Sequence, residues 1–330
     1  MAAEKTMHAV QYGGYGGGAE ALKHVEVPIP LPKKNEVLLK IDAAAINPFD
    51  WKVQKGAMRP FLPPKFPFTP VEDVAGEVVD VGPEVKSLKQ GDKVVSLLST
   101  GGGLAEYAVA SANLTTTIPP TIPPPEAAGL PAASLTALQA LRSAGCFDLQ
   151  RPPNQQPKNI LITAASGGVG HFATQLAKLA NLHVTATCGA RNMELVRSLG
   201  ADEVLDYKTP EGASLKSPSE KKYDAVIHCA TGISWSEFKP NLAEGGKVID
   251  ITPTVKVMLT WVLHRLTFCK KQLVPLLLSP EGKDLEFIVG LVKEGKLRTV
   301  VDSRYPLEKA EEAWGKSMAG HATGKIIVEM

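Results

Sequence analysis

The chain has 330 residues, of which 44% are hydrophobic and 21% charged, and its formal net charge at pH 7 is only +2. This composition predicts a globular protein of about two domains of ordinary size. The nearly balanced charge excludes the excess of basic residues that is typical of a nucleic-acid-binding protein. The four cysteines are scattered without paired spacing, which excludes a disulfide framework or a zinc cluster and indicates a reducing compartment.

The chain contains no segment that predicts a membrane span or a cleaved leader. The longest apolar candidate, residues 255–266, is interrupted by Lys256, His264 and Arg265, and a span needs roughly 20 apolar residues. Strand-like residues begin by Met7, so no cleavable presequence is expected. Basic residues around 265–271 leave peripheral contact with an anionic membrane open, although a solvated edge is the commoner explanation.

Residues 1–125 are predicted to form a β-rich domain. Short β-forming runs at 36–41, 75–81, 93–97 and 105–109 are separated by Gly and Pro clusters. The proline-rich run 117–125 forces an extended backbone and marks the crossing into a second domain over 126–270.

Helical spacing resumes at 126–141, and the polar stretch 149–157 is predicted to be a surface loop. After the second domain, residues 271–330 are expected to return to the first. They contain predicted helices at 284–293 and 309–318 and a final strand at 324–329.

The segment 159–170 (NILITAASGGVG) predicts a buried strand, a tight glycine turn and the start of a helix, the arrangement that holds a dinucleotide pyrophosphate. Gly167 can adopt dihedrals closed to other residues, Gly168 lets phosphate oxygens approach backbone amides, and Gly170 lets the helix pack close to the strand. The amides and dipole of the helix start favour an anion. The residues predicted to bind the cofactor here are Ser166, Gly167, Gly168, Val169 and Gly170.

Strands alternate with helices beyond this turn. Further strands are predicted at 183–188, 203–207, 224–229 and 246–251, with helices at 169–179 and 192–199. This alternation predicts an α/β fold with a doubly wound parallel sheet, in which ligands bind beyond the carboxyl ends of the strands. A glycine cluster alone is a weak signal, and this context strengthens it.

The end of the second strand of this sheet indicates which dinucleotide binds. An NAD-preferring site places Asp or Glu about 20 residues beyond the glycines, whereas this chain has Cys188-Gly189-Ala190-Arg191-Asn192 there. A guanidinium at Arg191 can pair with a 2′-phosphate, so NADP(H) is favoured over NAD(H). The alternative is that Arg191 is a solvated residue at a helix start. Tyr207, which closes the third strand, is a second candidate for the adenosine end.

Several motifs in order make the whole chain resemble the medium-chain dehydrogenase/reductase superfamily, in its zinc-free quinone oxidoreductase branch. Within that branch the chain is most similar to the plant chloroplast envelope group and its enone-reducing relatives, through 185–191 (TATCGAR) and 320–325 (GHATGK). The motifs shared with the wider branch are 45–52 (AINPFDWK), 73–82 (DVAGEVVDVG), 91–94 (GDKV), 135–137 (LTA), 165–170 (ASGGVG) and 200–201 (GA).

The resemblance implies a GroES-like β domain and a Rossmann domain with NADPH/NADP+ bound between them. It places Asn47, Asp50 and Lys52 at the nicotinamide end, where the Lys52 ammonium can hydrogen-bond the cofactor ribose or a developing oxyanion. Asp50 and Lys52 forming only a structural pair is an equally weighted alternative. Thr136 resembles a threonine that reaches the nicotinamide, with helix packing as its alternative. The expected cofactor set also includes Cys188, Gly189, Asn192, Ile251 and Lys325.

The resemblance also implies a reaction, namely hydride transfer from the nicotinamide. Zinc-dependent relatives polarise a carbonyl through a Gly-His-Glu motif, but this chain reads Val71-Glu72-Asp73 there, and no metal site is expected. Without a metal, feasible substrates are conjugated carbonyl compounds, which leave an enolate after hydride addition, and quinones. Trp51 and Phe61, Phe66 and Phe68 are candidates for an apolar pocket wall, with core packing as the commoner alternative.

The expected partners follow from the same resemblance. They are a small conjugated carbonyl or quinone and a second copy in a homodimer through sheet edges near the fifth and sixth Rossmann strands, with no nucleic acid. The expected location is the chloroplast, at the surface of the envelope inner membrane. A rival from another functional class is a sensor or structural protein that binds NADPH with little turnover.

Overall fold

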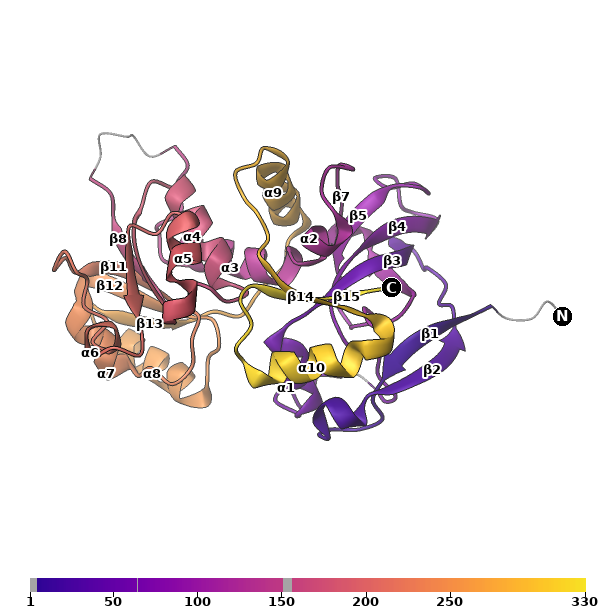
Figure 1. The fold of residues 1–330 in the computed structure, drawn as a ribbon, viewed down its shortest axis with the longest axis horizontal. Helices are drawn as coiled ribbons and strands as arrows, with labels where there is room; N and C mark the ends of the chain where they lie inside the picture. Colours follow the sequence, from indigo (N-terminus) through magenta and orange to yellow (C-terminus); the bar gives the residue numbers. More distant parts are fainter. Residues whose placement is uncertain (1–4, 64, 151–155) are drawn as a thin grey trace. The chain divides into compact units, whose positions relative to one another are not determined.

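The computed structural model describes residues 5–63, 65–150 and 156–330, and the chain divides into two compact units (Figure 1). Unit 1 comprises Met1–Leu135 and Pro280–Met330, and unit 2 comprises Thr136–Ser279. The boundaries therefore lie at 135 and 279, whereas the expected ones are 125 and 270. Residues 151–155 of the expected surface loop lie outside the described residues.

The two differences in boundary have structural reasons. Helix α2 (Pro124–Ala128) follows the proline run but packs on strands of unit 1, so the first unit extends beyond it. Strand β13 (Gln272–Pro275) forms hydrogen bonds to the sheet of unit 2, which carries the second boundary past residue 271.

Unit 1 is built on a seven-stranded sheet with the order β14-β15-β3-β4-β5-β7, in which β6 pairs with β3. Strands β1 and β2 form a separate antiparallel pair. Buried Leu39, Ile41 and Val74 form its core together with Trp314. The strands are β1 (Thr6–Gln11), β2 (Lys23–Pro28), β3 (Glu36–Ile46), β4 (Asp73–Val81), β5 (Lys93–Leu97), β6 (Tyr107–Ser111), β7 (Thr115–Thr117), β14 (Val301–Pro306) and β15 (Lys325–Glu329).

The helices of unit 1 are α1 (Pro48–Gln54), α2, α9 (Gly282–Lys293) and α10 (Ala310–Ala319), and α3 (Pro131–Ser143) begins in this unit. The buried indole of Trp314 on α10 donates to Gln54 Oε1 at 3.2 Å, which ties α10 to α1. The single helix expected at 126–141 is two helices, because Pro131 disfavours the helical conformation in the residue before it. The tie between α10 and α1 fixes the helix that begins directly after Asn47.

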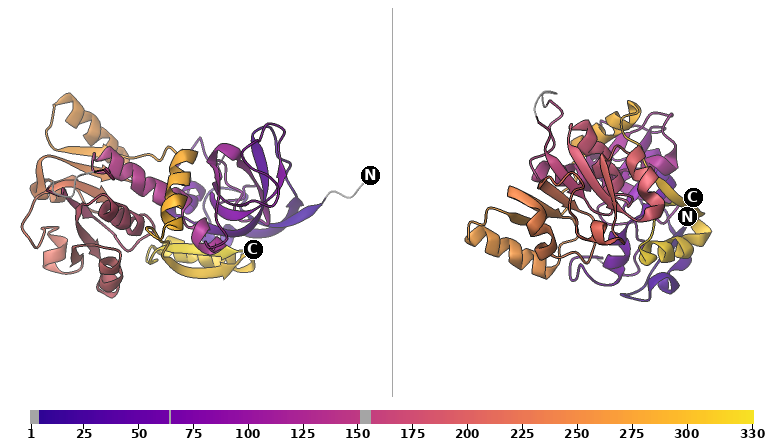
Figure 2. Two further views of the ribbon diagram at one scale, coloured as in Figure 1. Left: turned by 90° about the horizontal axis from the view of Figure 1, so that it is seen from above. Right: turned by 60° about the vertical axis from the view of Figure 1, so that its left-hand side comes forward.

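Unit 2 is a six-stranded parallel sheet with the order β10-β9-β8-β11-β12-β13, which confirms the doubly wound Rossmann-like fold. Helix α8 lies on one side of this sheet, and α4 and α5 lie on the other (Figure 2). The strands are β8 (Asn159–Ile162), β9 (His183–Cys188), β10 (Glu203–Asp206), β11 (Tyr223–His228), β12 (Leu242–Asp250) and β13. The helices are α4 (Gly170–Leu179), α5 (Met193–Ser198), α6 (Pro210–Ala213), α7 (Trp235–Phe238) and α8 (Val255–Leu266).

Strand β8 lies at the centre of this sheet, between β9 and β11. Its residues Ile160, Leu161 and Ile162 are fully buried, as expected for a strand covered on both faces. The chain order reverses at β8, because β9 and β10 extend to one side and β11, β12 and β13 to the other. The turn after β8 therefore stands at the switch point, where open α/β sheets bind ligands.

Candidate functional site

The glycine turn between β8 and α4 has the geometry of a phosphate cradle. A Cβ atom at Gly170 would lie 2.3 Å from the carbonyl oxygen of Ala164, so only glycine fits where the helix starts. The Gly167 amide closes the turn by donating to that same oxygen at 2.9 Å. Within the described chain, the amides of Ser166, Gly168 and Val169 donate to no protein acceptor. These residues therefore fit a dinucleotide pyrophosphate, whose oxygens accept such hydrogen bonds.

The predicted adenosine-end residues gather at the carboxyl ends of β9 and β10. Cys188 and Asp206 are register partners at these ends, and the half-exposed ring of Tyr207 packs by Gly189, whose ideal Cβ position is 3.6 Å from Tyr207 Cε1. Exposed Arg191 lies in the short helical turn Ala190–Asn192 that follows β9.

A side-chain contact links this adenosine end to the glycine turn. Asn192 Nδ2 donates to Ser166 Oγ at 3.0 Å. Burial, and next the nearby Asp206 carboxylate, raise the pKa of Cys188 to about 11, so its thiol stays protonated at neutral pH.

Two other predicted cofactor residues also belong to unit 2. Ile251 follows β12, and its amide donates to the carbonyl of His228 at 3.3 Å. Thr136 is half-buried on α3, at the start of unit 2. Their contact with a cofactor stays a prediction.

A hollow of about 460 Å³ lies at the carboxyl ends of β11 and β12, and the sequence did not predict it. His228, 3% exposed, lines it beside Asp250 and Trp235. Thr163 Oγ1 accepts from the amides that follow His228, at 2.9 and 3.2 Å, so its own hydrogen is directed to His228 Nδ1 at 3.0 Å. Burial lowers the pKa of His228, which keeps the imidazole neutral. The histidine spacing contained no signal for this arrangement, because the partner lies 65 residues away in the chain.

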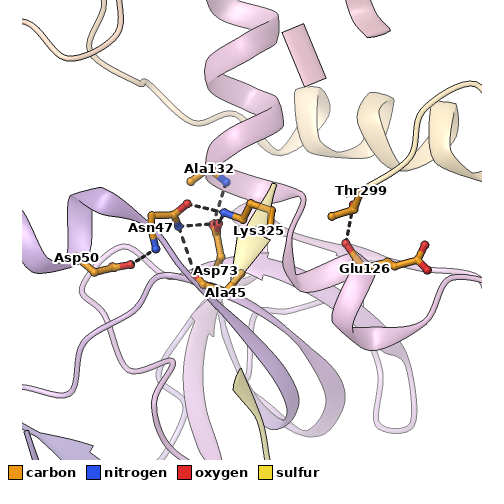
Figure 3. A network of polar contacts seen from close by, with 8 residues as sticks. All are labelled: Ala45, Asn47, Asp50, Asp73, Glu126, Ala132, Thr299 and Lys325. Atoms are coloured by element: carbon orange, nitrogen blue, oxygen red, sulfur yellow. Dashed lines mark hydrogen bonds and ion pairs between the residues drawn. The ribbon is translucent and has the colours of Figure 1, made fainter. Parts of the chain in front are cut away.

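Unit 1 contains a closed polar network around Asp73 (Figure 3). Asp73 is fully buried, and its Oδ1 accepts from the Ala132 amide at 2.9 Å. Its Oδ2 accepts from Asn47 Nδ2 at 2.8 Å and from Lys325 Nζ at 3.3 Å. Lys325, 2% exposed, also donates to Asn47 Oδ1. Lys325 is thus engaged by Asp73 and Asn47, and its contact with a cofactor stays a prediction.

Asp50 lies beside this network, on the first turn of α1. Its Oδ2 accepts from the backbone amide of Asn47 at 2.6 Å, which caps the helix start. Burial raises the pKa of Asp50 to about 7, and the negative Asp73 adds to this rise, while the Asn47 hydrogen bond and Lys325 oppose it. Asp50 and Glu72 both line a hollow of about 10 Å³, which is the size of one water molecule. The structure thus brings Asn47 and Asp50 together, as the resemblance implies.

Lys52 and the predicted aromatic wall are also on unit 1. Lys52 is half-buried on α1, and its ammonium lies 5.8 Å from the centroid of the Trp51 ring. Trp51, Phe66 and Phe68 pack against the core of unit 1, which favours the core alternative, and Phe61 is 77% exposed. Of the four aromatic residues, Phe68 also lines the small hollow beside Asp50. Among the residues that the structure describes, no three His, Cys, Asp or Glu side chains are grouped so as to hold a metal ion.

Family models match both parts of the chain. Residues 33–120 match the alcohol dehydrogenase GroES-like domain, and residues 199–328 match the zinc-binding dehydrogenase model. The first match lies within unit 1, and the second covers residues 199–279 of unit 2 and continues into residues 280–328 of unit 1.

Curated relatives and solved structures cover nearly the full length. The chain is 64% identical over 329 residues, 99% of both chains, to a chloroplast envelope quinone oxidoreductase homolog of Arabidopsis thaliana. It is 33% identical to an Arabidopsis NADPH-dependent alkenal/one oxidoreductase, over 98% of this chain and 80% of that protein. The quinone oxidoreductase structure from Coxiella burnetii superposes with a TM-score of 0.87 at 30% identity, covering 99% of this chain and 100% of that one.

These matches support an oxidoreductase, and they agree with the motifs on which the resemblance depends. The chain belongs to the medium-chain dehydrogenase/reductase superfamily and, within it, to the quinone oxidoreductase branch that includes the chloroplast envelope quinone oxidoreductase homologs.

Proposed function

We propose that this protein is an NADPH-dependent reductase of quinones or α,β-unsaturated carbonyl compounds that acts without a metal ion. The observation that supports it most is the phosphate cradle at 166–170 combined with Arg191, where an NAD-preferring site has an acid. The names of its relatives, a quinone oxidoreductase homolog and an alkenal/one oxidoreductase, agree with this substrate class.

In this proposal each unit contributes a separate set of groups. The amides of Ser166, Gly168 and Val169 bind the pyrophosphate, and Arg191 pairs with the 2′-phosphate. When bound, NADPH supplies a hydride to an electron-poor carbon. The Lys52 ammonium stabilises the negative charge that develops on the substrate oxygen, while Lys325 and Asp73 hold the Asn47 side chain in place.

A substrate panel tests this function. The purified protein is expected to oxidise NADPH with quinones and enones, and to leave simple alcohols unreacted with NAD+. The decrease in NADPH absorbance and the analysis of products measure the reaction with quinones and enones and the lack of reaction with alcohols. Turnover of alcohols with NAD+ and none with conjugated acceptors contradicts the proposal, and cofactor binding without any turnover favours the sensor alternative.

Arg191→Ala is expected to weaken NADPH binding by about 10- to 100-fold and to leave NADH binding unchanged, because a charge-assisted bond to the 2′-phosphate contributes about 1.5–3 kcal/mol. Fluorescence titration of both cofactors measures this. Arg197→Ala is the matched control, since Arg197 pairs with Glu194 on the exposed side of α5. An unchanged ratio of the two dissociation constants in Arg191→Ala rejects the assignment of Arg191.

The location and assembly are also part of the proposal. The proposed location is the chloroplast, with peripheral binding to the envelope inner membrane; the names of three relatives at 62–64% identity support the chloroplast, and one of those names supports the envelope. No helix in the described ranges of the chain is long and apolar enough to cross a bilayer. The edge strand β13 offers a surface at which a second copy can pair in a homodimer. Fractionation with salt washing tests the location.

A further inference from the structure

The carboxyl groups of Asp50, Glu72 and Asp73 in unit 1 are close enough to influence one another electrostatically. Asp50 and Asp73 both act electrostatically on Glu72, and Asp73 and Lys325 both act on Asp50. The Lys325 ammonium is held by Asp73 Oδ2 and Asn47 Oδ1. Lys325 is thus paired with Asp73 and has the smallest of the influences on Asp50, and no cation is among the groups that act on Glu72. A buried carboxyl group and a half-buried one in that position favour holding protons.

Asp50 is open on one side toward the small hollow. It is 4% exposed, and its Oδ2 accepts from Asn47, whereas its Oδ1 has no protein partner among the described residues. The water-sized hollow in front of it is also lined by Glu72, Phe49 and Phe68. An unpartnered oxygen of a buried side chain and a space for one water together indicate a path for a proton between Asp50 and Glu72.

Glu72 is the member of this cluster that reaches accessible surface. Its side chain is half-buried, whereas those of Asp50 and Asp73 are buried. In the described chain its carboxyl group accepts and donates no hydrogen bond, while its backbone carbonyl is fixed by the Leu98 amide at 2.7 Å. The backbone at Glu72 is thus anchored, and the carboxyl group is available to a ligand.

We propose that Glu72, in its protonated form, is the acid that delivers the proton to a conjugated carbonyl substrate after hydride addition, and that Asp50 reprotonates it through the water-sized hollow. This inference rests on the proposed function, because it names the proton donor of that reaction. It goes beyond the predicted set Asn47, Asp50 and Lys52, in which no proton donor is identified.

The step balances in atoms and electrons. The substrate gains a hydride at its β-carbon, and the electron pair of the double bond moves to give an enolate. The O–H bond of Glu72 then breaks and a C–H bond forms at the α-carbon, so the substrate has gained a hydride and a proton, which together amount to two electrons and two protons. The Glu72 carboxylate regains a proton from solvent by way of Asp50. A quinone is protonated on oxygen, which exchanges rapidly with water, so its reduction depends less on Glu72.

The surroundings of Glu72 keep its carboxyl group protonated at neutral pH. Burial, and next the neighbouring Asp50 and Asp73 carboxyl groups, together raise the pKa of Glu72 from 4.5 to about 9. Because the folded-state pKa is above the unfolded one, the native protein holds a proton that the unfolded chain releases. The stability of unit 1 therefore falls as pH rises from about 4.5 to about 9.

A first test uses the cofactor-free protein. Isotope-edited infrared spectra of glutamate-labelled protein are expected to show a protonated carboxyl band at pH 7 that disappears as the pH passes about 9. The band is expected to be absent in Glu72→Gln, whose stability is expected to vary less with pH over the same window. Glu77→Gln is the matched control and is expected to keep the band, because Glu77 lies on β4, which begins directly after Glu72 in the chain, but is paired with Lys93 at the surface. Absence of the band in the wild-type protein overturns the inference.

A second test measures turnover in D2O. Enone reduction by Glu72→Gln is expected to slow by about 10²- to 10⁴-fold, the usual contribution of a general acid, and deuterium at the α-carbon is expected to lose its preference for one face. The rate of quinone reduction by Glu72→Gln is expected to change little. The rate of enone reduction by Glu77→Gln is also expected to change little. An unchanged enone rate and facial selectivity in Glu72→Gln overturns this inference alone. A wild-type protein that reduces no conjugated acceptor overturns the proposed function as well.

Discussion

Replacing Gly170 with alanine is expected to weaken NADPH binding by about 10²-fold and to destabilise unit 2 by about 1–3 kcal/mol. The added Cβ would lie 2.3 Å from the Ala164 carbonyl oxygen and 2.7 Å from the Ala165 Cα, both backbone atoms that no rotamer change can move. Overpacking of this kind costs about 1–3 kcal/mol, and displacement of a binding group by about 1 Å can cost 10²-fold. NADPH fluorescence titration and urea denaturation measure the two effects.

Gly290→Ala is the matched control for this prediction. Gly290 also lies on a helix, α9, but an added Cβ there meets no atom within 4 Å. Alanine is favoured over glycine inside helices, so this variant is expected to bind NADPH normally and to be as stable as the wild-type protein or more so. If Gly170→Ala binds NADPH as tightly as Gly290→Ala, the turn after β8 does not hold the pyrophosphate.

The fold of unit 2 could be predicted because its signals are local. The apolar run 160–162, the glycines at 167–170 and the repeated alternation of strands and helices each lie within short segments, and the structure places β8, β9 and α4 at or next to the expected bounds. The break between α2 and α3 was missed, although Pro131 and Gly129 contain a signal for it. The sequence did not predict strands β13 and β14, because each is short and is placed in its sheet by neighbouring strands.

The candidate site could be predicted only in part, because its decisive contacts are distant in sequence. The resemblance supplied Asn47 and Asp50, but Lys325 and Asp73 are 252 residues apart, and no local pattern links them. The same holds for Thr163 and His228, which meet only when β8 and β11 become neighbours in the sheet. Glu72 stands where zinc-dependent relatives have their metal motif. Its unpartnered carboxyl group depends on the side chains packed around it.

The contrast between Lys325 and a surface lysine shows how burial changes the consequence of losing a cation. Lys93 bonds two carboxylates, Asp42 and Glu77, both at 3.1 Å, yet its side chain is 45% exposed. Water replaces such a cation at little cost, so Lys93→Met is expected to change stability by less than about 1 kcal/mol. Lys325 has a longer contact to its carboxylate, 3.3 Å, but both side chains are buried.

Lys325→Met is therefore expected to destabilise unit 1 by about 3–5 kcal/mol, because it leaves the Asp73 carboxylate buried without a counterion and removes the donor to Asn47 Oδ1. The double variant Asp73→Asn/Lys325→Met, which removes both charges, is expected to recover more than half of that loss. Urea denaturation of the two variants, of Asp73→Asn and of Lys93→Met at pH 7 gives the coupling energy directly. A loss below about 1 kcal/mol in Lys325→Met would mean that solvent reaches Asp73.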